Sequence, residues 1–218
     1  MATQGSRADT LKKLSIEGYK SIKSLKDFEL RPLNVLIGAN GAGKSNFVGF
    51  FRLLHKMIHK RLQTTVAVEG GADACLHLGP KETRKLEGRL YFGSNGYEFT
   101  LLPTHDGRFV FSEEIAYFDG DHGQIRTPLG LGHVEANLKD RKDDPGRKAR
   151  KGVPHCVFEA IGNWVVYHFH DTSFHSGVRR PHALNDDVSL RFNADNLAPF
   201  LYRIQRTSRT ATPASARW

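Results

Sequence analysis

The sequence has few cysteines, no long apolar run and fewer acidic than basic residues. The two cysteines, Cys75 and Cys156, lie far apart without metal-ligand spacing, which excludes a disulfide framework and favours a reducing compartment such as the cytoplasm. No apolar run approaches the ~20 residues of a membrane-spanning helix, and residues 1–9 lack the apolar stretch of a signal peptide. We therefore expect no membrane partner. The formal charge of +9 over 218 residues favours a polyanionic partner such as nucleic acid.

Among the patterns that are present, the octapeptide at residues 38–45 is the most informative. It consists of Gly38, Ala39, Asn40, Gly41, Ala42, Gly43, Lys44 and Ser45. It fits G-x-x-x-x-G-K-[ST], follows the apolar run 33–37 and precedes a segment of helical periodicity, which is the context of a phosphate-binding loop. Its glycines let backbone N–H groups converge on one phosphate. In this interpretation Lys44 reaches the β- and γ-phosphates of ATP and the Ser45 hydroxyl ligates Mg²⁺. The alternative is a glycine turn that caps a helix.

Apolar periodicity around this phosphate loop predicts three strands and a helix. Apolar residues alternate over 14–19 and over 20–30, as in half-buried strands, and the run 33–37 predicts a strand directly under the loop. After the loop, apolar residues recur at helical spacing and form one stripe that we expect to pack into the core. The stripe comprises Phe47, Phe50, Phe51, Leu54, Met57, Ile58 and Leu62.

Beyond Gly70 the periodicity changes from helical to strand-like. Two apolar segments flank the turn residues 93–96, which predicts a β-hairpin. Two more short apolar runs follow at 108–111 and 115–118. Together they predict an antiparallel meander over about residues 86–118.

The C-terminal region carries weaker signals. Residues 164–171 read as a buried strand, and 195–205 as an amphipathic helix with Asp195 or Asn196 as its cap. Residues 206–218 have no apolar period, so we expect a disordered tail or a frameshifted end.

Two polar segments admit more than one interpretation. Residues 139–151 contain seven basic and three acidic residues around a Pro-Gly pair. They form either a solvated loop or a contact with the DNA backbone. His168, His170 and His175 are close enough in sequence to suggest a metal site, but no cysteine joins them.

Two stretches around the phosphate loop resemble a known family. Residues 14–22 (LSIEGYKSI) and 34–47 (NVLIGANGAGKSNF) are similar to the bacterial AAA-type predicted ATPases related to SMC, RecF and OLD proteins, which have ABC-type heads. Residues 167–173 and 195–198 add to the resemblance, which covers most of 11–205. It implies an α/β fold in one domain: a P-loop NTPase head lobe with a mixed sheet around the phosphate-loop helix, plus the antiparallel meander.

The resemblance also implies site residues outside the octapeptide. Asn46 extends the cofactor-binding set, and Lys20 takes the place of a basic residue that approaches the nucleotide after the first strand. The turn at His170 and Asp171 matches the region that senses the γ-phosphate and the metal, although the usual glutamine is absent.

Three parts of such ATPases have no convincing match in the sequence: the acidic strand end, the serine-glycine signature loop and the switch histidine. Asp119 ends an apolar run, but Gly120 follows where the catalytic base belongs. Residues 14–18 mimic a signature loop but lie on the first strand. We therefore expect the N-terminal half of an ATPase head, with little hydrolysis by this chain alone.

These observations leave two hypotheses for the function. In the first, the chain is the ATP-binding lobe of an SMC/RecF-like ATPase that acts in DNA repair or phage defence. Its expected partners are ATP with Mg²⁺, a second copy or a missing C-terminal half, and DNA. In the second, the chain is a non-catalytic nucleotide- or DNA-binding remnant of such an ATPase.

Overall fold

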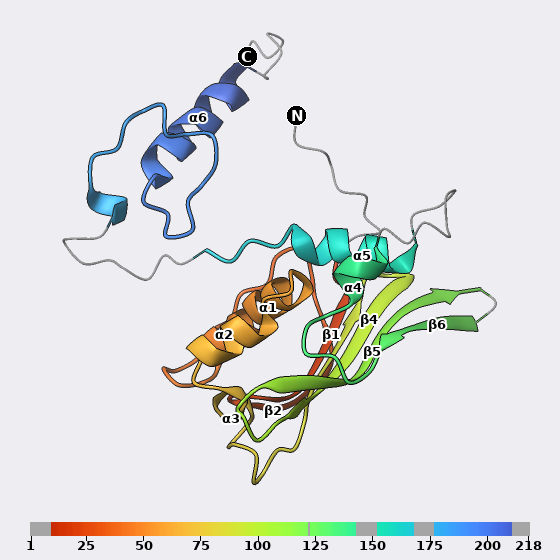
Figure 1. The fold of residues 1–218 in the computed structure, drawn as a ribbon. Helices are drawn as coiled ribbons and strands as arrows, with labels where there is room; N and C mark the ends of the chain where they lie inside the picture. Colours follow the sequence, from red (N-terminus) through yellow and green to blue (C-terminus); the bar gives the residue numbers. More distant parts are fainter. Residues whose placement is uncertain (1–9, 122, 143–151, 168–176, 211–218) are drawn as a thin grey trace. The chain divides into compact units, whose positions relative to one another are not determined.

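The computed structural model of the chain describes residues 10–121, 123–142, 152–167 and 177–210. They belong to two compact units, which divide between Trp164 and Val165. The domain expected over residues 11–205 thus spans both units. The first unit contains the phosphate loop and all the described strands (Figure 1).

The first unit is built on one six-stranded sheet with the strand order β2-β1-β3-β4-β5-β6. Every neighbouring pair in this order is antiparallel. The strands are β1 (Lys13–Tyr19), β2 (Ile22–Glu29), β3 (Leu86–Tyr91), β4 (Asn95–Pro103), β5 (Phe109–Gly120) and β6 (Gly123–Gly130). The strands predicted on either side of residue 20 and the predicted hairpin around 93–96 are confirmed.

The predicted fold class is wrong. An ABC-type head has a mixed sheet with parallel strands around its phosphate-loop helix, whereas the described strands form only antiparallel pairs. Residues 33–37 are not a strand, and Val35 and Ile37 are 72% and 92% exposed. The apolar run signals a preference for burial on both faces. A strand also needs a neighbour that pairs with its backbone, and none of the described strands pairs with this segment.

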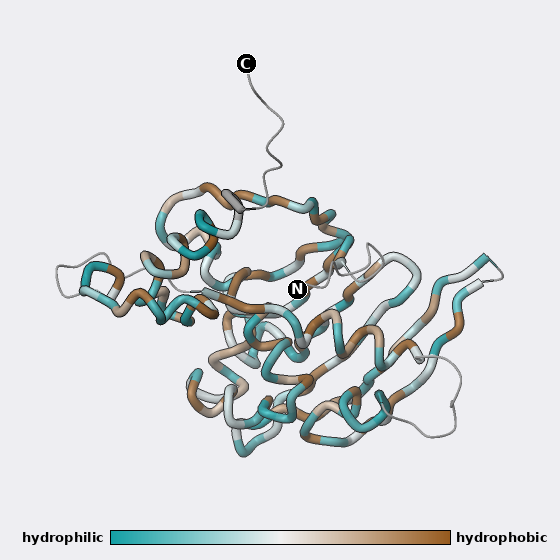
Figure 2. Tube along the Cα trace, turned by 90° about the horizontal axis from the view of Figure 1, so that it is seen from above, coloured by the Kyte–Doolittle hydropathy of each residue, from teal (hydrophilic) through white to brown (hydrophobic). Residues whose placement is uncertain are grey.

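The strands of the sheet follow from their alternating sequences. Leu14 and Ile16 on β1 are buried, whereas Ser15 and Glu17 between them are partly exposed, because successive side chains of a strand point to opposite faces. The same alternation of apolar and polar residues is visible along the strands in Figure 2. The apolar face of the sheet therefore packs inward, and the opposite face is polar.

The helix α1 (Lys44–Ile58) covers the apolar face. Its predicted stripe is confirmed, because Phe50, Leu54, Met57 and Ile58 are completely buried. Phe50 lies against Tyr19 of β1 and Phe99 of β4, at ring-centroid distances of 5.4 and 6.4 Å.

The predicted helix does not continue through Leu62. Lys60 adopts a left-handed backbone conformation with φ of 58°, and Leu62 begins a new helix, α2 (Leu62–Val68). The Glu135 carboxylate accepts hydrogen bonds from the backbone N–H groups of Leu62 and Gln63, at 2.8 and 3.0 Å, and so satisfies the first donors of α2. The short helix α3 (Ala72–Cys75) follows.

Two helices follow the meander and complete this unit. The helix α4 (Leu138–Arg141) is short, and α5 (Val153–Gly162) buries Val157 and Ile161 in the same core as α1. Trp164, just after α5, packs on Phe51 of α1 with ring centroids 5.2 Å apart.

The predicted meander is confirmed over β3, β4 and β5, with one difference. Residues 109–120 form a single strand, where the sequence suggested two. The ladder with β4 shifts register between Thr100 and Leu101, and this bulge lets one long strand carry an irregular apolar pattern. The bulge lies near Glu114, a completely buried carboxylate of β5.

Glu114 joins β4, β5 and the segment that leads into α4. Its Oε1 accepts hydrogen bonds from Tyr97 Oη at 2.8 Å and from the Leu138 N–H at 3.2 Å. Its Oε2 accepts one from the Asn137 N–H at 2.9 Å and lies 2.7 Å from His133 Nε2. Burial of this carboxylate is therefore compensated by four polar neighbours.

The second unit contains a short 3₁₀ helix, η3 (Gly177–Arg179), and the helix α6 (Leu197–Thr210). The predicted helix at 195–205 is confirmed, and it continues five residues into the segment for which we expected disorder. The strand predicted at 164–171 is not formed over its described part, 164–167, where Val165 is 61% exposed. Residues 168–171 and 211–218 lie outside the described residues.

Candidate nucleotide-binding site

The phosphate loop leads directly into the N-terminus of α1. Gly43 is the N-cap residue and has φ of 90°, a left-handed conformation that glycine adopts without strain. The first helical hydrogen bond runs from the Phe47 N–H to the Gly43 carbonyl, 2.9 Å. No side chain caps the helix, so the N–H groups of its first turn face outward at the positive end of the helix dipole.

The side chain of Lys44 folds back over the phosphate loop. Its ammonium donates hydrogen bonds to the carbonyl oxygens of Gly38, at 2.7 Å, and Ala39, at 2.8 Å. The positive charge is therefore held at the mouth of the loop, beside the N-terminus of α1. Ser45 follows it on the helix with an exposed side chain.

The turn between β1 and β2 lies against the start of α1. Ser21 Oγ accepts a hydrogen bond of 2.8 Å from Asn46 Nδ2. A Cβ atom on Gly43 would lie only 2.6 Å from the same oxygen, so a larger residue here would displace the Ser21 hydroxyl from its present position. Ser21 is a neighbour of the site that the sequence analysis missed, because no local pattern signals contacts between a turn and a helix more than 20 positions away.

Lys20, in the same turn, is engaged elsewhere. Its ammonium forms an ion pair with Glu69, the residue that follows α2, and Arg52 of α1 lies 3.7 Å from the other oxygen of that carboxylate. Lys20 is thus near the phosphate loop, because the adjacent Ser21 contacts the start of α1, but its ammonium is paired with Glu69.

The backbone of this turn is fixed by the segment after α3. The Lys20 N–H donates to the Cys75 carbonyl at 2.9 Å, and His77 Nδ1 lies 2.7 Å from the Lys20 carbonyl oxygen. Burial raises the pKa of the Cys75 thiol to about 11 and also raises the pKa of Tyr19. Both groups are therefore neutral at physiological pH and act as packing residues.

The other candidate residues are not brought to the loop within the described part of the chain. Asp119 pairs with Gln124 in the β5–β6 hairpin, as expected for a hairpin end. Residues 143–151, with most of the basic segment, and residues 168–176, with His168, His170, Asp171 and His175, lie outside the described residues. Among the described residues, no group of three or more His, Cys, Asp or Glu side chains could hold a metal ion.

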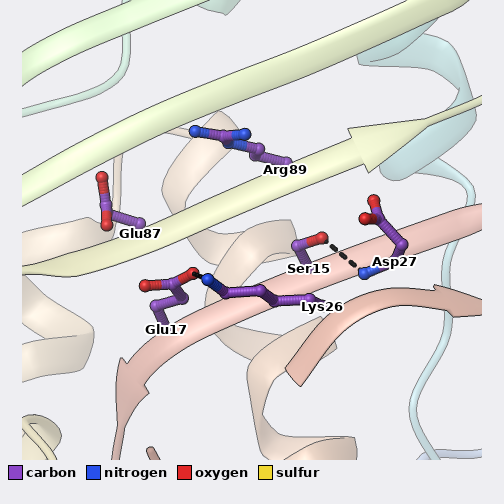
Figure 3. A pocket seen from close by; sticks show the side chains of 6 residues that line it. All are labelled: Ser15, Glu17, Lys26, Asp27, Glu87 and Arg89. Atoms are coloured by element: carbon purple, nitrogen blue, oxygen red, sulfur yellow. Dashed lines mark hydrogen bonds and ion pairs between the residues drawn. The ribbon is translucent and has the colours of Figure 1, made fainter. Parts of the chain in front are cut away.

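A pocket of about 140 Å³ lies on the polar face of the sheet (Figure 3). It is lined by Ser15, Glu17, Lys26, Asp27, Glu87 and Arg89. Ser15 Oγ accepts the Asp27 N–H at 2.9 Å, and Lys26 pairs with Glu17 at 3.4 Å. Charges of both signs, with Lys26 paired to Glu17, are typical of the solvated face of an antiparallel sheet. This pocket is thus a weaker candidate than the phosphate loop.

Comparison with protein-family models, with curated proteins and with solved structures finds no match. No helix within the described ranges has both the length and the apolar character needed to cross a bilayer.

Proposed function

We propose that the chain binds ATP together with Mg²⁺ through residues 38–46. The observation that carries this proposal is the pairing of the G-x-x-x-x-G-K-S sequence with an uncapped N-terminus of α1. A helix start with open N–H groups and a neighbouring ammonium suits a phosphate group.

The residues of the loop fit the parts of a bound nucleotide. The N–H groups of the first turn of α1 would donate to phosphate oxygens. Lys44 would exchange the carbonyl oxygens of Gly38 and Ala39 for the β- and γ-phosphates, which are stronger acceptors because they are charged. The exposed hydroxyl of Ser45 would ligate the Mg²⁺ that neutralises these phosphates.

We propose binding with little turnover by this chain alone. Phosphoryl transfer to water needs a group that orients the water and further positive charge at the γ-phosphate. Among the described residues, no carboxylate forms a hydrogen bond or ion pair with residues 38–46. The resemblance to SMC, RecF and OLD proteins supports a role in DNA repair or phage defence, in the cytoplasm, with a second copy or another polypeptide completing the site. The basic charge supports DNA as a further partner.

Calorimetric titration with ATP tests the proposal. We expect Mg²⁺-dependent binding that is lost with EDTA and weakened about ten- to a hundredfold in Lys44→Ala, because a charge-assisted contact contributes roughly 1.5–3 kcal/mol. Lys23→Ala is the matched control, since Lys23 is an exposed lysine of β2 outside the loop. Equal affinities of the wild type and Lys44→Ala would refute the assignment of the loop.

Steady-state phosphate release tests the second part of the proposal. We expect turnover far below the ordinary enzymatic range of about 1 s⁻¹ or more. Turnover in that range, absent from Lys44→Ala, would contradict it and show that this chain supplies its own catalytic base.

A further inference from the structure

The contact between the β1–β2 turn and the start of α1 is held in place from several sides. Tyr19 packs edge-on against Phe50, and its hydroxyl lies under Gly49 of α1. The Lys20 ammonium is tied to α2 through Glu69, and the Lys20 N–H to the Cys75 carbonyl. These contacts fix the position from which the Ser21 hydroxyl meets the helix.

Ser21 contacts the two residues that flank Lys44 and Ser45. Its Oγ lies where a Cβ atom on Gly43 would be only 2.6 Å away, and it accepts a hydrogen bond from the side-chain amide of Asn46. The first turn of a helix is its least constrained part, because its N–H groups have no helical acceptors. A side chain that is hydrogen-bonded to Asn46 and lies beside Gly43 restricts how the intervening N–H groups can point.

We propose, on the basis of the ATP binding proposed above, that Ser21 is a positioning residue of the nucleotide site. It acts through Asn46 and Gly43: it holds the first turn of α1 in the orientation in which Lys44, Ser45 and the backbone N–H groups receive the phosphates. Preorganised donors bind an anion more tightly because less conformational freedom is lost on binding. The effect of Ser21 is therefore on nucleotide affinity, and only weakly on the stability of the exposed turn.

The test compares Ser21→Ala, Ser21→Thr and Asn46→Ala by titration with ATP and Mg²⁺ and by thermal unfolding without nucleotide. We expect Ser21→Ala to weaken ATP binding about three- to tenfold, the range for one hydrogen bond. Ser21→Thr restores the affinity because it keeps the hydroxyl. Ser24→Ala, at an exposed serine of the adjoining strand β2, is the control and leaves the affinity unchanged.

A double variant separates positioning from an independent effect of each residue. If Ser21 acts through Asn46, Ser21→Ala combined with Asn46→Ala binds ATP no more weakly than Ser21→Ala alone. Unchanged affinity in Ser21→Ala, or a lower unfolding temperature with unchanged affinity, would overturn the role of Ser21 while the ATP site stands. Absence of ATP binding by the wild type would overturn both.

Discussion

Replacing Glu114 by alanine tests the polar network that anchors the meander to the helices after it. The carboxylate is completely buried and has four polar neighbours: Tyr97 Oη, His133 Nε2 and the N–H groups of Asn137 and Leu138. Alanine would remove the acceptor and leave these groups in a site that water does not reach.

The magnitude follows from those orphaned groups. Each buried donor without an acceptor costs about 1–3 kcal/mol, and breaking a buried charged network costs about 3–5 kcal/mol in total. We therefore expect Glu114→Ala to lower the free energy of unfolding by about 3–5 kcal/mol. Glu114→Gln keeps an acceptor for Tyr97 and for the Leu138 N–H if its oxygen takes the place of Oε1, but it turns an NH₂ group toward the Asn137 N–H, so about 1–3 kcal/mol is expected.

Urea unfolding followed by tryptophan fluorescence measures this loss, since Trp164 packs on Phe51 in the same unit and reports its unfolding. Glu113→Ala is the matched control: it makes the same change in net charge at the neighbouring, exposed position of β5. A loss below about 1 kcal/mol for Glu114→Ala, or an equal loss for Glu113→Ala, would contradict the compensation of buried charge by hydrogen bonds.

Two further predictions concern Cys75 and the exposed apolar run. Burial raises the pKa of the Cys75 thiol to about 11 in the folded state. The folded chain keeps this proton where the unfolded chain releases it, so stability is full below the ordinary thiol pKa of about 8.5 and falls as the pH rises toward about 11. Cys75→Ala should make the unfolding free energy fall less steeply over this alkaline range. An unchanged slope would contradict the assignment of the decline to Cys75. Val35 is 72% exposed, so Val35→Lys should reduce light scattering at high protein concentration and change the unfolding free energy by no more than about 0.5 kcal/mol. A loss of unfolding free energy as large as that of a core substitution would show that this segment is buried in solution.

Local signals in the sequence predicted the elements that depend on local interactions. The turn residues 93–96 require no distant partner to form a hairpin, and the stripe of α1 identifies its buried face from spacing alone. The phosphate loop is another local pattern: the helix predicted after it is formed, whereas the strand predicted before it is not.

Elements that depend on distant neighbours were predicted less well. The apolar run 33–37 looks like a strand, but strand formation requires a partner backbone that the described part of the chain does not supply. The contact of Ser21 with Asn46 depends on where the β1–β2 turn is held by Cys75 and His77. No periodicity in the sequence carries that information.

The pairing of β1 with β3 has a kinetic consequence for the candidate site. The phosphate loop and α1 to α3 all lie in the chain between β2 and β3. The ends of this long segment are brought together only when Lys13–Glu17 of β1 pairs with Glu87–Tyr91 of β3. Closing such a large loop is entropically costly, and contacts between distant residues form slowly. During synthesis the first hairpin must wait several seconds for β3 to leave the ribosome at about 5–20 residues per second. The loop that we propose to bind ATP therefore acquires its final surroundings late in folding, and substitutions in the β1–β3 ladder can delay its formation without touching it.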